Sequence, residues 1–239
     1  MATPLRLLVF IILWSASACG HVVDPPPEPP RVPFVEAALI AGATTTTVRA
    51  GWLDSERLSS GVSAPATLVD LTLTDETTGA SIRLTRHDDT LYLATLAIRP
   101  GHRYRLAGRI EAAPIHATTT VPEQFVIEAP VGDSIMLDSA SPTSLTTAVG
   151  YRWRALGATA FVVDSAWFPP GQTATRAPIG QMIVPHRPAG APARLLRIVA
   201  VNRDLDEYLY RTPAPASNVF GGFGVVGAAI SAERRLVTR

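Results

Sequence analysis

Residues 68–75 read Leu-Val-Asp-Leu-Thr-Leu-Thr-Asp, and this stretch decides the fold class. From Val69 onward apolar and polar residues alternate, which places the two kinds of side chain on opposite faces of a β-strand. Turn-forming residues follow at 75–80, and residues 81–86 (Ser-Ile-Arg-Leu-Thr-Arg) alternate again. The two segments predict a β-hairpin whose polar face lies in water.

The rest of the first half also consists of short segments typical of β-strands. Segments rich in β-branched and apolar residues recur at short intervals, with a Pro-Gly turn at 100–101; they are 34–41, 44–48, 91–98 and 103–107. A long helical pattern or a crossover helix is missing between them, which favours an antiparallel arrangement. We therefore predict an all-β protein whose first domain, residues 34–124, is an immunoglobulin-like β-sandwich.

The second half predicts another, looser β domain over residues 125–239. Its strand candidates are 125–127, 135–137, 149–154, 160–163 and 191–203. Only the stretch near 204–210 is typical of a helix: Asp204 could cap it, and Glu207 could reach back three residues as in a capping box.

The N-terminus has the layout of a secretory signal peptide over residues 1–18. Arg6 supplies a positive charge, residues 7–14 are apolar, and residues 15–18 are small. An apolar run of this length is too short to span a membrane, which takes ~20 residues. Residues 16–19 (Ala-Ser-Ala-Cys) resemble the lipobox of bacterial lipoproteins, in which the cysteine is acylated and becomes the first mature residue. The alternative is ordinary cleavage after Ala18 without lipidation.

A proline-rich segment follows the predicted lipid-attachment residue, Cys19. Six prolines lie between residues 25 and 33, and proline favours extended polyproline II structure at ~3.1 Å per residue. Residues 19–33 therefore predict a lipidated cysteine followed by a semi-rigid stalk, which measures ~30 Å from Asp24 to Pro33 and holds the folded part off a bilayer.

Charge and cysteine content narrow the function classes. Removing the signal peptide leaves 20 basic and 20 acidic residues, since the whole chain has 21 and 20 and Arg6 is lost. Nucleic-acid binding needs clustered positive charge, so this balance argues against a nucleic-acid partner. The single cysteine cannot form an internal disulfide, so the fold must hold through its core.

One motif matches a nucleotide-binding pattern letter for letter. Residues 222–227 (Gly-Phe-Gly-Val-Val-Gly) fit G-x-G-x-x-G, but only twelve residues follow Gly227. A dinucleotide site needs a helix and an acidic residue ~20 positions further on. We interpret the three glycines as structural and predict a final strand over 220–230 that packs closely against a neighbour, with no nucleotide or other cofactor.

Catalytic and metal sites have little support in the sequence. The histidines are scattered without zinc-site spacing, and a G-x-S-x-G motif is missing (His21, His87, His102, His116 and His186). Residues 87–89 (His-Asp-Asp) could bind a cation, but a solvated turn is the simpler interpretation. Trp52, Trp153 and Trp167 are candidates for core or ligand platform, with core preferred for Trp153. We therefore assign no catalytic, metal or cofactor-binding residue.

Several segments together resemble an uncharacterised family of bacterial outer-membrane lipoproteins (domain of unknown function 4249). The C-terminal segments are 196–203 (Leu-Arg-Ile-Val-Ala-Val-Asn-Arg) and 217–228 (Ser-Asn-Val-Phe-Gly-Gly-Phe-Gly-Val-Val-Gly-Ala). The lipobox, the Pro-Gly turn at 100–101 and a Thr-Thr-Val-Pro ending at 119–122 add to the likeness. The resemblance implies an outer-membrane lipoprotein, often associated with TonB-dependent receptors, and implies no known activity.

These observations favour a membrane-anchored, non-enzymatic binding or accessory module, serving an outer-membrane TonB-dependent transporter. The expected partners are the membrane, through the lipid on Cys19, and an outer-membrane receptor. Two alternatives remain open: a hydrolase with a dispersed active site, and a purely structural surface protein. A cluster of histidine and carboxylates in a pocket would favour the enzyme, and an exposed aromatic patch would favour binding.

Overall fold

The computed structural model describes most of the chain after residue 30, namely residues 31–54, 64–129, 134–137, 149–165, 175–177, 181–184, 194–210 and 216–238. The chain divides into two units, Met1–Pro30 and Arg31–Arg239, and all described residues belong to the second. The predicted signal peptide, Cys19, most of the predicted stalk and Trp167 lie outside the described residues.

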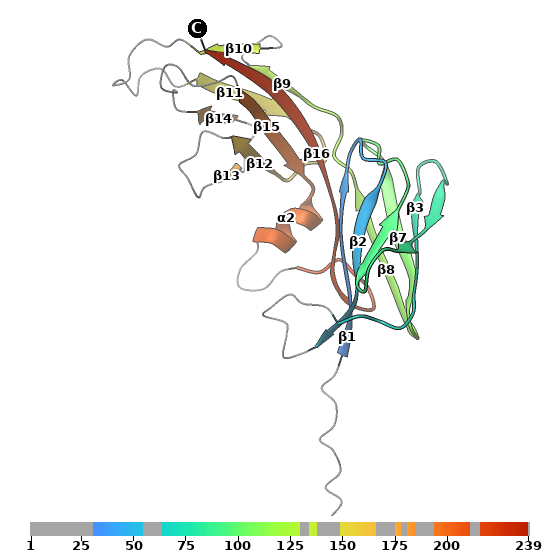
Figure 1. Cartoon of the computed structure of the whole chain (residues 1–239). Helices are drawn as coiled ribbons and strands as arrows, with labels where there is room; N and C mark the ends of the chain where they lie inside the picture. Colours follow the sequence, from blue (N-terminus) through green and yellow to red (C-terminus); the bar gives the residue numbers. More distant parts are fainter. Residues whose placement is uncertain are drawn as a thin grey trace, which may run out of the picture. The chain divides into compact units, whose positions relative to one another are not determined.

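The described part is built almost wholly from strands (Figure 1). In chain order the elements are β1 (Arg31–Ile40), β2 (Thr46–Asp54), β3 (Val69–Asp75), β4 (Ser81–Arg83), β5 (Thr85–Arg86), β6 (Leu91–Ala94), β7 (Arg103–Ile110), β8 (Ala113–Thr120), β9 (Val126–Ala129), β10 (Ser134–Leu137), β11 (Val149–Arg154), β12 (Ala160–Ser165), β13 (Thr175–Ala177), β14 (Gln181–Val184), β15 (Arg194–Val201), α2 (Arg203–Tyr210) and β16 (Phe223–Thr238).

These strands form three sheets. The largest has nine strands in the order β13-β12-β15-β16-β1-β2-β6-β5, with β10 added to β16. A four-stranded sheet has the order β4-β3-β7-β8, and a three-stranded sheet has the order β14-β11-β9.

The long strand β16 occupies the middle of the large sheet. Its first residues pair in parallel with β1, from Phe34↔Phe223 to Ile40↔Ala229. Its later residues pair antiparallel with β15, from Val201↔Ala229 to Arg194↔Leu236. The last strand therefore joins the first strand of the unit to its C-terminal half.

One face of the large sheet carries two successive cores. Val226 and Ala228 of β16 belong to the first core, which lies against the four-stranded sheet and includes Leu71, Leu73 and Tyr104. Ile230 is two residues further along the same strand, so it lies on the same face. It belongs to the second core, with Phe125 just before β9 and with residues of β9, β11, β12 and β15 (Ile127, Trp153, Phe161, Ile198 and Ala200).

The opposite face of β16 is covered by α2. Leu205 of the helix packs with Ala229 and Val201, which point away from the two larger cores. Tyr208 lies against Phe223, with the ring centroids 6.3 Å apart. The helix thus fills the side of the sheet that the two smaller sheets leave open.

The prediction of an all-β sandwich is confirmed, and its immunoglobulin-like character stays a prediction. Leu71 and Leu73 are buried as the alternation predicts, and Trp153 is a core residue. The segments on the two sides of the predicted boundary at 124/125 share the large sheet and belong to one compact unit. The predicted stalk is too long by three residues, because β1 begins at Arg31 and Pro33 pairs with Trp52.

The glycines of the 222–227 motif let the backbone approach its neighbours. A Cβ on Gly224, whose φ is +124°, would overlap the carbonyl oxygen of Val35, its partner in β1. A Cβ on Gly227 would lie 2.6 Å from the Cβ of Leu205 in α2. The prediction of a closely packed final strand is therefore confirmed, although the strand runs from Phe223 to Thr238. A strand, not a helix, follows these glycines, unlike the dinucleotide motif.

Replacing Gly224 by alanine should lower the free energy of unfolding by about 3 kcal/mol, through the positive φ and the collision with Val35. Gly79→Ala is the matched control, because Gly79 has φ +78° with open space around it. We expect the control to cost about 1 kcal/mol. Urea unfolding of both variants measures the difference. Equal losses would show that contact between β16 and β1 does not require glycine.

Candidate functional site

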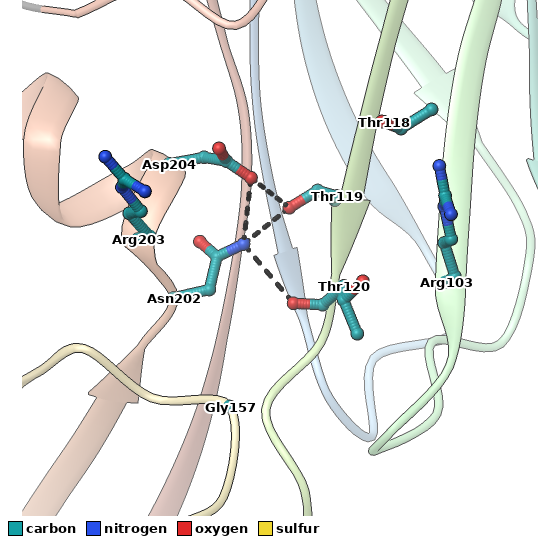
Figure 2. A pocket seen from close by; sticks show the side chains of 8 residues that line it. All are labelled: Arg103, Thr118, Thr119, Thr120, Gly157, Asn202, Arg203 and Asp204. Atoms are coloured by element: carbon teal, nitrogen blue, oxygen red, sulfur yellow. Dashed lines mark hydrogen bonds between the residues drawn. The ribbon is translucent and has the colours of Figure 1, made fainter.

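A polar pocket of about 380 Å³ lies where the end of β8 meets the connection between β15 and α2 (Figure 2). Strands β7 and β8, the turn before β12 and the start of α2 supply its lining: Arg103, Thr118, Thr119, Thr120, Gly157, Asn202, Arg203 and Asp204. Its walls therefore come from segments on both sides of the predicted domain boundary.

Asn202 is the buried centre of this region, with only 5% of its surface exposed. Its Oδ1 accepts hydrogen bonds from the backbone N–H groups of Leu205 (3.2 Å) and Ala228 (3.0 Å). The first bond caps the N-terminus of α2 and the second holds β16. Two N–H donors on one atom fix the orientation of the amide, because a flipped amide would set NH₂ against them.

The amide nitrogen of Asn202 points toward β8. Its Nδ2 donates to the hydroxyl of Thr119 (2.6 Å), the carbonyl oxygen of Thr120 (3.3 Å) and Oδ2 of Asp204 (3.2 Å). Thr119 in turn donates from its hydroxyl to the same Oδ2 of Asp204 (3.1 Å). The three side chains and the backbone carbonyl of Thr120 form one connected network, and such networks hold their members in a single geometry.

Asp204 carries the acidic charge of the pocket. Burial raises the pKa of its carboxyl group, and hydrogen bonds from the side chains of Thr119, Asn218 and Asn202 offset only part of that effect. The residue lies in the first turn of α2, where the helix dipole favours negative charge. The site therefore holds a half-buried carboxylate that an additional cationic partner would stabilise.

The side chain of Asn218, like that of Asn202, bonds the backbone of β8. Its Oδ1 accepts from the N–H of Val226 (2.9 Å), and its Nδ2 donates to the carbonyl oxygens of Val226 (2.9 Å) and Thr118 (3.3 Å). Asn202 bonds the carbonyl of Thr120 in the same way. The two amides thus occupy backbone groups on the outer edge of β8 that a neighbouring strand would otherwise bind.

Two arginines flank the pocket. The Nε of Arg103 lies 3.0 Å from Oε2 of Glu76, and the Nε of Arg203 lies 2.7 Å from Oε1 of Glu207. Exposed ion pairs of this kind contribute at most about 1 kcal/mol to stability. Each pair orients its guanidinium group through Nε.

The predicted cap of α2 is wrong in its residue. We expected Asp204 to cap the helix and Glu207 to reach back to it, but Asn202 is the capping residue and Glu207 pairs with Arg203. The helix begins at Arg203, so Asp204 lies inside its first turn and faces the pocket. Asparagine is a strong N-cap residue, so the sequence did contain a signal for the true cap, Asn202.

A second, more open cleft of about 610 Å³ is lined by Arg99, Pro100, Gly101, His102, Glu123 and Gln124. Nδ1 of His102 lies 2.9 Å from Oδ2 of Asp75, which is buried. Oδ1 of Asp75 accepts from the backbone N–H groups of Thr77 (2.9 Å) and Thr78 (3.2 Å). The Asp75–His102 pair therefore fixes the predicted turn at 75–80. It uses Nδ1 of the imidazole, and Nε2 is not part of the pair.

The remaining candidate residues are separated from these sites. His87, Asp88 and Asp89 are exposed at a bend, where Arg86 pairs with Asp89 (3.0 Å). The indole nitrogen of Trp52 donates to Oε1 of Glu111 (3.2 Å), so Trp52 is tied to the turn after β7. His21, His186 and Trp167 lie outside the described residues.

In the described part of the chain, His, Cys, Asp and Glu side chains do not gather in groups of three or more that could hold a metal ion. Nor does that part contain a helix long and apolar enough to cross a membrane.

No protein-family model matches the chain, and the curated proteins also contain no match. The resemblance to the outer-membrane lipoprotein family therefore stays a prediction.

Replacing Asn202 by aspartate should lower the free energy of unfolding by about 3 kcal/mol. The change keeps Oδ1 but sets a second carboxylate oxygen against Asp204 and the carbonyl of Thr120. Arg203→Gln, at the neighbouring exposed position, is the control and should change stability by less than about 0.5 kcal/mol. Urea unfolding measures both. A loss no larger than that of the control would mean that the amide network does not stabilise the fold.

Asp75 should make the protein sensitive to acid. Burial alone would raise the pKa of its carboxyl, but hydrogen bonds from His102, Thr78 and the N–H groups of Thr77 and Thr78 outweigh burial and lower it below 3.8. A lowered pKa stabilises the fold above the unfolded value and loses that effect as pH falls through the folded value.

We therefore expect Asp75→Asn to cost about 2 kcal/mol at pH 7. The gap between variant and wild type should close as pH falls below 3.8. Unfolding in urea at pH 7, 5 and 3 follows the gap. Asp70→Asn, at an exposed ion pair with Arg83, is the control and should show almost no gap. A gap for Asp75→Asn that is constant with pH would contradict the role given to its charge.

Proposed function

We propose that this protein is a lipoprotein of the bacterial outer membrane that binds a ligand or partner at the membrane and does not transform a substrate. The observation that carries the proposal is Cys19, which follows a signal-like segment and small residues at 16–18 and precedes a proline-rich stretch. Acylation adds ~0.8 kcal/mol of membrane affinity per buried CH₂, so several chains would anchor the protein durably.

The binding role is supported by the kind of site that the anchored unit offers. The pocket at β8 and α2 presents hydrogen-bonding and charged groups held in place by the buried amide of Asn202. Sites of this kind suit recognition, because their polar groups are oriented before a ligand arrives. Tethering raises the effective concentration of two partners on one membrane, so a weak interface would suffice.

The partner class comes from the family resemblance. The resemblance of the segments at 196–203 and 217–228 points to an accessory protein of a TonB-dependent transporter in the outer membrane. The immunoglobulin-like sandwich that we infer for residues 34–124 is compatible with this role, since such sandwiches are frequent in cell-surface binding proteins.

A hydrolase is the second candidate, favoured by one specific observation. His102 lines the open cleft with Glu123, and Asp75 holds its Nδ1. A carboxylate on Nδ1 fixes the tautomer of a histidine and leaves Nε2 to act as a general base. A hydrolase would use His102 in this way on a substrate bound in the cleft.

Cys19→Ser should move the protein from the membrane fraction to the soluble fraction, or leave it uncleaved, because it removes the sulfur that would carry the lipid. His21→Ala, two residues downstream, is the control and should remain in the membrane. Crosslinking in intact cells should recover an outer-membrane receptor with the wild type and not with Cys19→Ser. A variant lacking residues 20–30 tests the stalk without cutting into β1.

Two results would contradict the proposal. If Cys19→Ser stays membrane-bound after normal cleavage, a lipid on Cys19 is not the anchor. Turnover of ester or amide substrates that His102→Gln abolishes, with unchanged folding and no recovered partner, would establish the hydrolase instead.

A further inference from the structure

We propose that the solvent-facing side of the four-stranded sheet binds an acidic polysaccharide, a sugar chain that carries carboxylate groups. This rests on the binding role proposed above and names its ligand class. The carboxylates of the polymer contact arginines along β7, and a sugar ring packs on an exposed aromatic pair beside them.

Alternation along the strands separates this face from the core. Leu71, Leu73 and Tyr104 point inward, so the residues next to them in the chain point to solvent. We call the outward side the arginine face, because its charged residues are four arginines and one aspartate: Arg83, Arg103, Arg105, Arg109 and Asp70. The face therefore has an excess of positive charge, although the predicted mature chain is balanced.

Two arginines of the face have acidic partners and two do not. Arg83 and Arg103 pair with nearby carboxylates. Among the described residues Arg105 and Arg109 make no ion pair, and both are exposed. Guanidinium groups bind carboxylates more strongly than they bind neutral acceptors. An acidic ligand would therefore supply what these two side chains lack.

The spacing of the arginines suits an extended chain. Arg105 and Arg109 lie two residues to either side of the small side chain of Ala107, ~7 Å from it along β7 in each direction. Arg103 continues the same row by another two residues. A polymer that runs along β7 meets the three arginines in turn, so these groups need not converge on one anion.

An exposed aromatic pair stands beside this row. The ring centroids of Phe220 and His116 are 4.5 Å apart, and Phe220 is 67% exposed. The backbones of the two residues exchange hydrogen bonds of 2.8 and 3.2 Å. A Cβ on Gly221, whose φ is +80°, would overlap the carbonyl oxygen of Pro114, so this segment lies close against β8. The exposed phenyl ring is thus held in place, as in a binding surface.

The aromatic pair favours a sugar chain over other polyanions. The C–H groups on one side of a sugar ring carry partial positive charge, and the face of an aromatic ring carries negative charge. His116 is opposite Ala107 in the register, so a sugar on the pair lies one strand away from the arginines of β7. Single-stranded nucleic acid uses a series of rings for successive bases, and the described residues of the face offer this one pair.

The arginine face continues into the pocket at β8 and α2. Arg103, Thr118 and Thr120 line the pocket and also belong to the outward side of β7 and β8. Figure 2 shows Thr118 on the side of Arg103, and Thr119 on the opposite side of β8 with Asp204. The threonine hydroxyls of the outward side can bond the hydroxyl groups of a sugar.

The experiment titrates the full chain, purified in detergent, with alginate oligosaccharides, which carry a carboxylate on each sugar, and measures affinity by calorimetry. Dextran is a neutral polysaccharide and should not bind. Poly-L-glutamate keeps the carboxylates without the sugar rings and should bind about fivefold more weakly than alginate. Raising the salt to ~0.15 M should weaken alginate binding, because salt screens exposed charges. These comparisons need no variant, so they hold even where a variant fails to fold.

Two variants and a control test the residues. Arg105→Gln combined with Arg109→Gln should weaken alginate and poly-L-glutamate alike, by about tenfold. Phe220→Ala should weaken alginate about fivefold and leave poly-L-glutamate unchanged. Arg154→Gln removes the same charge from an exposed position of β11, in the three-stranded sheet, and should bind as the wild type does.

Five outcomes would overturn the proposal. Three concern the ligand: no alginate binding at low salt, dextran binding as tight as that of alginate, and tighter binding of oligothymidylate, which would make the partner a single-stranded nucleic acid. The other two are full alginate affinity in the double arginine variant, and full alginate affinity in Phe220→Ala.

The titration needs neither a lipid anchor nor a receptor, so its failure is distinct from failure of the proposed function. No alginate binding, with a receptor still recovered by crosslinking, would remove the ligand class and keep the proposed function. Alginate binding as predicted, with Cys19→Ser still in the membrane after normal cleavage, would remove the lipid anchor and keep the ligand class.

Discussion

The structure depends on the insertion of β16 between β1 and β15. Its parallel pairing with β1 and antiparallel pairing with β15 put residues from the two ends of the unit into one sheet. The same face of that strand then supplies Val226 and Ala228 to one core and Ile230 to the other. Removing β16 would expose the ladders of two strands and open both cores.

Two amide side chains, the buried Asn202 and the partly buried Asn218, also tie β16 to its neighbours. Asn202 binds the backbone of α2, β16 and β8 through one side chain, and Asn218 binds β16 and β8. A buried amide that satisfies all its donors and acceptors stabilises one arrangement of the chain, because any other arrangement leaves them unpaired. The pocket is held in one arrangement for the same reason, because Asn202 also bonds the side chains of Thr119 and Asp204.

Local features of the fold could be predicted from the sequence, and long-range pairings could not. Alternation over residues 69–74 predicts which side chains are buried, and the glycines at 222–227 predict a close contact. Nothing in either stretch specifies that β16 pairs with β1, about 190 positions earlier. That pairing depends on complementary surfaces of complete strands, and a sequence read in order suggests two separate domains instead.

In the candidate site, too, local features could be predicted from the sequence and long-range contacts could not. Asn202 precedes a helical pattern and could have been recognised as its cap, but Asp204 has equal local preference for that position. The contacts of Asn202 with Thr119 and of His102 with Asp75 join residues 83 and 27 positions apart, and chain spacing carries no signal for them. Only the folded backbone brings these groups together.

The central claim is that β16 makes residues 31–239 one cooperative unit. Amide hydrogen exchange at increasing urea concentrations, read by mass spectrometry in peptides from β7 and β15, tests it most directly, because the two strands lie in different sheets over different cores. The account predicts that the exchange free energies of both strands converge on one value and fall with the same slope. Loss of protection in β15 at a urea concentration that leaves β7 fully protected would contradict it.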